Sequence, residues 1–124
     1  ALDAGVKVIA AHGCSNGVFF AEPHLKTMDS MMRKYPEFYV DLSALTLPNR
    51  VGALLRLSAH GRWRERFLFG TDYPLPCLSY PALAGGLGAF WGAFKAGNRF
   101  DRQAAVLDAL GLGPAADPAR VLRL

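Results

Sequence analysis

Residues 66–74, RFLFGTDYP, constrain the fold of this chain more than any other stretch. An apolar run of strand length ends at a small residue and a carboxylate, and Pro74 stops the strand because proline has no N–H to donate to a β-ladder. Strand alternation puts Phe67 and Phe69 on one face and Asp72 on the other. Catalytic groups in parallel α/β folds sit at the carboxyl ends of strands. Asp72 is therefore a candidate catalytic residue, the alternative being a cap for the next turn or helix.

Two earlier segments end in a similar way. Residues 6–11 form an almost continuous apolar run that predicts a buried parallel strand closed by His12. Residues 38–44 alternate cleanly, with apolar side chains on one face. We expect polar groups to share one face at the three strand ends: His12, Asp41, Ser43 and Asp72.

Helical patterns separate and follow these strands. We predict helices from 22–23 to 35, from 48 to 59, from 81 to 95 and from 101 to 110, and a last helical turn that begins at 117–118. In the second helix Val51, Leu54, Leu55 and Ser58 are expected to face inward, with His60 and Gly61 at its end. Strand–helix units of about 30 residues predict an α/β fold with a parallel sheet and helices outside it.

Composition narrows the class of protein. The 124 residues, 52% hydrophobic and 19% charged, suit one globular domain. The net charge of +4 is scattered apart from Arg62, Arg64 and Arg66, and no module for nucleic acid is recognisable. No apolar run reaches the roughly 18 residues that span a bilayer. Cys14 and Cys77 are too few for a disulfide framework, which favours a reducing, cytoplasmic location.

His12 and Asp72 at equivalent strand ends suit a divalent metal site or an acid–base pair. The structural alternative is a His–Asp hydrogen bond between neighbouring strands. Cys14 could act as a nucleophile beside His12, although small buried cysteines are usually inert. Near the same rim, Arg50 could hold a substrate carboxylate, and Asn16 is a weaker candidate for substrate binding, as is Ser43.

Three segments together resemble a known family. The stretches VIAAHG (8–13), FYVDLSA (38–44) and RFLFGTDYP (66–74) look like three consecutive late strands of an amidohydrolase-related metal-dependent hydrolase. The branch is the one similar to aminocarboxymuconate-semialdehyde decarboxylase and 2-pyrone-4,6-dicarboxylate lactonase. The closing DPARVL (117–122) is similar to the family's terminal helix, with Asp117 where asparagine is commoner.

The resemblance implies a (β/α)8 TIM-barrel type of fold, of which residues 1–124 would form roughly the last three βα units and the C-terminal helices. It implies one or two metals, commonly zinc, with Asp72 as a metal ligand or base and His12 as a ligand or a group that polarises the substrate. The implied function is hydrolysis of a small carboxylate, lactone or amide by a metal-activated water. A related decarboxylase is an alternative within the same family.

The family's H-x-H motif on the first strand is absent from this sequence. Three strands cannot close an eight-stranded barrel. The chain also opens on residues 1–5 like the last turn of a helix. We therefore expect the C-terminal part of a longer enzyme that needs its N-terminal barrel half or a partner chain, with homo-oligomers also allowed. The competing hypothesis is a catalytically silent α/β module completed by a partner.

Overall fold

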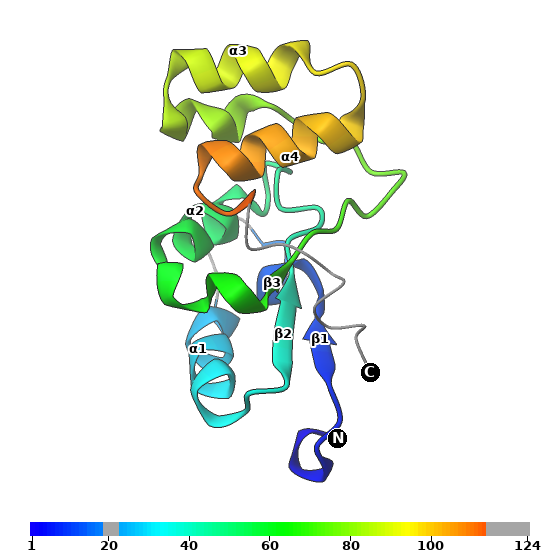
Figure 1. Cartoon of the computed structure of the whole chain (residues 1–124), viewed down its shortest axis with the longest axis vertical. Coiled ribbons are helices and arrows are strands. Elements are labelled where there is room, and N and C mark those ends of the chain that lie inside the picture. The colour runs from blue at the N-terminus through cyan, green and yellow to red at the C-terminus, as the bar shows by residue number, and fades with distance from the viewer. Residues whose placement is uncertain (19–22, 114–124) are drawn as a thin grey trace.

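A computed structural model of the chain describes residues 1–18 and 23–113 and shows a small mixed α/β fold. Strands β1 (Val8–Ala10), β2 (Phe38–Asp41) and β3 (Phe67–Leu68) form a parallel sheet in that order. Helix α1 (His24–Lys34) connects β1 to β2, and α2 (Val51–Ala59) connects β2 to β3. Both helices lie on the same side of the sheet (Figure 1). The predicted alternation and parallel sheet are confirmed, whereas the closed barrel stays a prediction.

A helical layer lies beyond the carboxyl ends of the strands (Figure 1). It contains α3 (Leu87–Lys95) and α4 (Arg99–Ala109), with a 3-10 helix before them, η4 (Tyr80–Gly85). Shorter 3-10 segments occur at η1 (Leu2–Ala4), η2 (Ala11–Cys14) and η3 (Gly61–Arg66). Gly5 closes η1 in the left-handed conformation, as the helix-end pattern of residues 1–5 predicts.

The predicted strands 6–11, 38–44 and 67–71 are too long, and the first is not buried as expected, since Ile9 of β1 is 48% exposed. Each strand ends a few residues before a residue with a left-handed backbone conformation. These residues are His12 (φ 53°), Ala44 (φ 55°) and Asp72 (φ 55°). Extended pairing cannot continue through that conformation. The period-two alternation therefore does not reach His12 or Asp72, and their positions depend on the turns after the strands.

The helix predictions also need correction. Helix α2 begins at Val51 because the residues before it form turns, in which the Arg50 N–H donates to the Leu47 carbonyl. Leu55 was expected inside but is 43% exposed, whereas Leu57 is fully buried. The predicted helix 81–95 is interrupted at Gly86, whose φ of 103° only glycine adopts readily.

The N-cap of α4 is Asn98, so the helix begins before the predicted range 101–110. The Asn98 Oδ1 accepts from the Asp101 backbone N–H at 2.9 Å, and its Nδ2 donates to the Asp101 carboxylate at 2.7 Å. The helix therefore begins at Arg99, two residues before the predicted start, and Asp101 lies in its first turn. Gly111, with φ 69°, follows the helix as expected.

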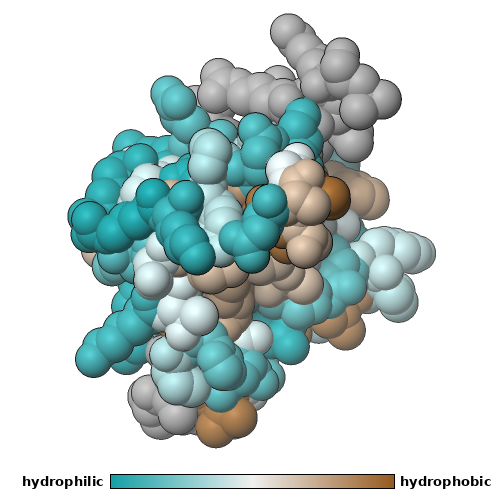
Figure 2. All heavy atoms as spheres, turned by 90° about the horizontal axis from the view of Figure 1, so that it is seen from below, coloured by the Kyte–Doolittle hydropathy of each residue, from teal (hydrophilic) through white to brown (hydrophobic). Residues whose placement is uncertain are grey.

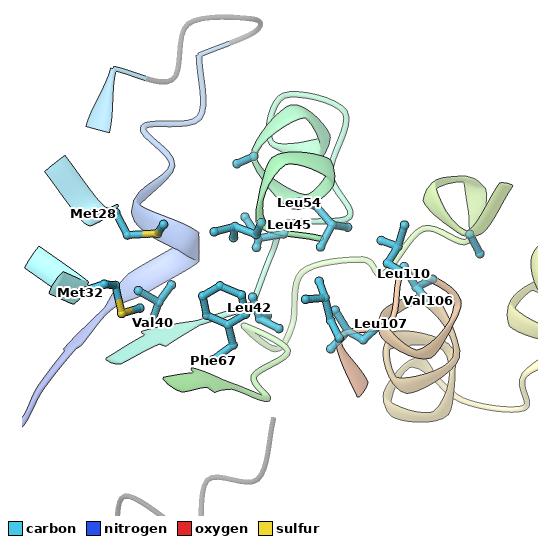
Figure 3. Close-up of a cluster of buried hydrophobic side chains, with 14 of the residues drawn as sticks. Met28, Met32, Val40, Leu42, Leu45, Leu54, Phe67, Val106, Leu107 and Leu110 are labelled. Atoms are coloured by element: carbon cyan, nitrogen blue, oxygen red, sulfur yellow. The ribbon is translucent and has the colours of Figure 1, made fainter. Parts of the chain in front are cut away.

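The core joins both halves of the molecule (Figure 3). Met28 and Met32 of α1 are almost fully buried against the sheet and belong to this core. Phe67 of β3 is fully buried at the centre, and Leu107 brings α4 into the same cluster. The surface at the opposite end, where the strands begin, is mostly hydrophilic (Figure 2).

Some sequence predictions lie outside the described residues. These are the terminal segment 117–122, which carries part of the family resemblance, and the helix start at Glu22. Within residues 1–18 and 23–113, no helix is long and apolar enough to cross a membrane.

Candidate functional site

Unusual backbone conformations gather at the carboxyl ends of the three strands. Among the described residues, the non-glycine residues with positive φ are His12, Cys14, Ala44 and Asp72, and all of them follow a strand. The left-handed conformation costs a residue with a Cβ about 1–2 kcal/mol. Such strain persists only where surrounding contacts impose it, and it concentrates at functional sites. The backbone therefore singles out this edge of the sheet.

Asp41, the last residue of β2, organises that edge. Its Oδ1 accepts from the backbone N–H of His12 at 3.1 Å and from the backbone N–H of Ser43 at 2.9 Å. The same oxygen accepts from the Ser43 hydroxyl at 2.5 Å. The carboxylate thus fixes the turn after β1 and the turn after β2 together, which explains how His12 is held in its left-handed conformation.

Ser43 connects Asp41 to the imidazole of His12 through hydrogen bonds. The single hydroxyl proton of Ser43 is donated to Asp41, so its oxygen accepts from His12 Nδ1 at 2.8 Å. His12 Nδ1 therefore carries a proton. In the neutral imidazole the lone pair then lies on Nε2, on the opposite edge of the ring. Ser43 itself is only 5% exposed, and its polar groups are occupied within this chain of contacts.

Asp72 faces that Nε2 from the end of β3. The distance from His12 Nε2 to Asp72 Oδ2 is 3.6 Å, too long for a hydrogen bond. The two side chains are 26% and 38% exposed, so a solute can reach the gap between them. We call His12, Asp41, Ser43 and Asp72 the His12 cluster. The structure brings together all four polar residues predicted for the strand ends.

The gap between His12 and Asp72 has a width that suits two ligands of one metal ion. Two ligands of a tetrahedral zinc, each about 2.0–2.2 Å from the metal, lie about 3.4 Å apart. The observed 3.6 Å is close to that spacing. A histidine that binds metal through one nitrogen commonly donates from the other, as His12 does to Ser43. Catalytic zinc sites use three protein ligands, and the described residues hold no group of three candidate ligands.

Cys14 lies next to the cluster but is poorly suited to nucleophilic chemistry. Burial, and secondly the negative charge of Asp41, raise the pKa of its thiol to about 11. Near neutral pH the side chain is therefore a thiol, whereas the nucleophile in cysteine catalysis is the thiolate. This argues against the alternative in which Cys14 attacks the substrate.

Arg50 and Asn16 meet at the loop after η2 rather than in the cluster. A Cβ at Gly17 would lie 3.2 Å from Arg50 Nε, so the guanidinium packs against that loop. Arg50 Nε is buried and has no hydrogen-bond partner among the described residues. Asn16 Oδ1 accepts from the Val18 N–H at 3.1 Å and closes a local turn. The structure describes no contact between either side chain and the His12 cluster.

Two supporting residues were not found from the sequence. A Cβ at Gly70 would lie 3.2 Å from Ser43 Cβ, so glycine lets the end of β3 approach the cluster closely. Gln103 of α4 is 1% exposed, and its Nε2 donates to the Leu42 carbonyl at 3.1 Å and to the Gly70 carbonyl at 3.4 Å. A polar residue in the apolar stripe of a helix was the available signal for Gln103.

Comparisons of this chain with protein-family models, with curated proteins and with solved structures found no match.

Proposed function

We propose that this chain forms the C-terminal part of a metal-dependent hydrolase of the amidohydrolase type. The proposed substrate is a small carboxylate, lactone or amide, and the proposed metal is zinc. The observation that supports this most is the convergence of His12 Nε2 and Asp72 Oδ2 at 3.6 Å, while Ser43 and Asp41 occupy the other nitrogen of His12. That arrangement leaves two electron-pair donors facing one accessible gap.

The roles of the residues follow from this geometry. A bound divalent metal supplies a water of lowered pKa and an electron-withdrawing centre for a carbonyl oxygen. Asp72 offers a carboxylate that takes a proton from an attacking water. In the alternative in which His12 is not a metal ligand, its protonated ring can donate from Nε2 to a substrate oxygen. Asp41, reached through Ser43, stabilises that imidazolium because its negative charge lies 3.9 Å from His12 Nδ1.

Arg50 is the proposed anchor for a substrate carboxylate. It follows β2 on the same edge of the sheet as the His12 cluster, and its buried Nε lacks a partner among the described residues. An unpaired buried donor is costly unless a ligand satisfies it. A planar guanidinium can bind a carboxylate through two parallel hydrogen bonds. This supports a preference for substrates with a negative charge.

The remaining metal ligands would come from the N-terminal barrel half or from a partner chain. One observation fits this requirement, because β1 pairs with β2 and with no second strand among the described residues. Ile9 of β1 is 48% exposed and Val6 is 51% exposed. The same observation favours the second candidate function, a silent α/β module that a partner strand completes without catalysis.

The test uses the natural protein that contains this chain, with Asp72→Asn and the exposed Asp108→Asn as a matched control. Bound metal is measured by mass spectrometry of the purified protein, and turnover on a panel of lactones, amides and carboxylates. We expect Asp72→Asn to lower bound metal by at least about tenfold and turnover by at least about a hundredfold. The control should change neither.

Unchanged metal content and turnover in Asp72→Asn would contradict the enzyme hypothesis and favour the silent module. Release of carbon dioxide without hydrolysis would assign the decarboxylase alternative, since both reactions use the same pair of residues. Iodoacetamide at neutral pH should leave Cys14 unmodified and turnover unaffected, because the reagent reacts with the thiolate and the Cys14 side chain is a protonated thiol at that pH.

A further inference from the structure

Helix α3 has an unusual composition for a helix on the outside of a fold. Its sequence, LGAFWGAFK, is apolar on every side except at Lys95. A helix of this kind is normally buried all round. In α3 only Ala93 is buried, on the side that packs against α4 and η4. Ala89 and Phe90 are half-buried, and the remaining residues of the helix are exposed and apolar apart from Lys95.

The exposed side carries a ridge of large side chains. Leu87 is 72% exposed, Trp91 52% and Phe94 55%. Their spacing of four and then three residues places them on one face of the helix. The rings of Trp91 and Phe94 meet edge to face with centroids 5.5 Å apart, so the ridge is ordered by its own contacts.

A furrow runs beside this ridge. Gly88 and Gly92 are one helical turn apart, next to Leu87 and Trp91 in the sequence. A Cβ built at either glycine meets nothing within 4 Å. The furrow is therefore open to a second helix, which could approach closely because no side chain stands in the way. We call this ridge and furrow the α3 face: Leu87, Gly88, Trp91, Gly92, Phe94 and Lys95.

We propose that the α3 face is a homodimer interface, in which α3 of one copy packs antiparallel against α3 of a second copy. A two-fold interface needs a surface complementary to itself, and a ridge beside a furrow on one helix satisfies that need. Charge agrees with this occupant. Residues 80–95 contain one charged side chain, Lys95, and antiparallel pairing puts the two copies of Lys95 at opposite ends of a contact about 13 Å long.

The available area sets the strength of the dimer. Aromatic side chains carry about 150–250 Å² each, of which about half is exposed at Trp91 and Phe94, so these rings and Leu87 together offer on the order of 400 Å² per copy. Two copies would bury on the order of 800 Å², an area found in weak, transient complexes. We therefore expect a reversible dimer with a Kd of about 1–100 µM rather than an obligate one.

The first experiment is sedimentation velocity of the natural protein over a concentration series. We expect a monomer–dimer equilibrium, and we expect Trp91→Lys to raise the Kd at least about tenfold. The matched control is Leu55→Lys, which alters a residue of α2 that is 43% exposed, away from the α3 face. It should change the Kd by less than about twofold. Circular dichroism and thermal melts check that both variants fold.

The Gly92→Leu variant distinguishes close packing of two α3 helices from binding of the α3 face to another partner. The new side chain meets open space in the monomer and suits a helix better than glycine, so the melting temperature should hold or rise. It fills the furrow, however, and should weaken the dimer at least about tenfold. A membrane surface would respond in the opposite direction, because an added leucine strengthens binding to lipid.

A sedimentation coefficient that is independent of concentration up to about 100 µM would overturn the proposal. A dimer that tolerates both Trp91→Lys and Gly92→Leu would overturn it as well, since the contact would lie elsewhere. Co-flotation with phosphatidylcholine–phosphatidylserine vesicles, increased by Gly92→Leu, would assign the α3 face to a membrane surface instead. None of these results depends on metal binding or on turnover.

Discussion

The His12 cluster and the α3 face are built on opposite principles. The cluster is polar, and its contacts join residues about 30 positions apart in the sequence, such as His12 to Asp41 and to Ser43. The α3 face is apolar, and α3 packs mainly against its sequence neighbours η4 and α4. Chemistry at the strand ends therefore depends on the whole sheet being assembled, whereas association through α3 depends on one local stretch of sequence.

The largest effect should follow from changing the charge that orders the cluster. Asp41→Asn keeps an oxygen for the backbone N–H groups of His12 and Ser43 but removes the negative charge that stabilises the imidazolium. We expect metal affinity or turnover to fall by about 10–100-fold. Metal titration and steady-state kinetics measure this, with sedimentation as the control. A change in the Kd of the dimer would show that the His12 cluster and the α3 face are not independent.

Removing the amide that ties α4 to the sheet should mainly lower stability. Gln103→Leu leaves the Leu42 and Gly70 carbonyls without this donor and the Cys77 thiol without its acceptor. We expect a loss of about 2–3 kcal/mol in the free energy of unfolding, since buried polar groups lose their partners. Urea unfolding followed by circular dichroism gives the value. A loss below about 0.5 kcal/mol would mean that water replaces the amide.

A third set of polar contacts, centred on Asp29, provides a comparison for the His12 cluster. Asp29 of α1 accepts from Trp63 Nε1 at 2.8 Å, from Arg62 at 2.6 Å and from Arg33 at 2.9 Å. The Trp63 hydrogen bond, followed by that of Arg33, holds the pKa of Asp29 well below its usual range. Because the folded pKa lies below the unfolded value of about 3.9, the stabilisation is present above that pH and is lost as the pH falls toward the folded pKa.

We therefore expect Asp29→Asn to cost about 1 kcal/mol of stability at pH 7, and the difference from the natural protein to shrink in acid. Urea unfolding at several pH values between 2 and 7 measures this difference. Turnover should not change, because Asp29 belongs to the outer helices and makes no described contact with the His12 cluster. If Asp29→Asn lost turnover while its stability stayed unchanged, Asp29 would have to be counted as part of the functional site.

The smallest effect is expected on the α3 face. Leu87→Gln places an amide at a position that is 72% exposed, so the unfolding free energy of the monomer should change by less than about 0.5 kcal/mol. The same urea titration measures it at a protein concentration far below the Kd of the dimer. This variant mirrors Gln103→Leu, since one adds an exposed amide and the other removes a buried one. A large loss would show that Leu87 supports the monomer fold.

The sequence predicted the architecture well because apolar periodicity reports burial. Phe38, Val40 and Leu42 are buried as their alternation indicates, and so are Met28 and Met32 of α1. It failed at Leu55, where an apolar residue was taken to mean an inward position although Leu57 occupies the core. Apolar composition without a clear phase leaves the orientation of a helix open, and packing against neighbouring elements decides it.

For the candidate site, the sequence identified the residues but not how they are connected. His12, Asp41, Ser43 and Asp72 were all predicted, yet as members of continuing strands. Their contacts arise from left-handed turns that no local propensity predicts for histidine or aspartate with certainty. Arg50 and Asn16 were predicted because they follow strand ends in the sequence. In the structure they lie at a neighbouring loop and make no described contact with the cluster.

Gln103 also has a consequence for the order in which the chain matures on the ribosome. Its amide satisfies carbonyls of residues synthesised 61 and 33 positions earlier. Until α4 has left the exit tunnel, the ends of β2 and β3 lack that donor, and their turns have less to hold them in place. A nascent chain that stops before α4 would thus contain every residue of the His12 cluster but lack the contact that ties the ends of β2 and β3 to α4.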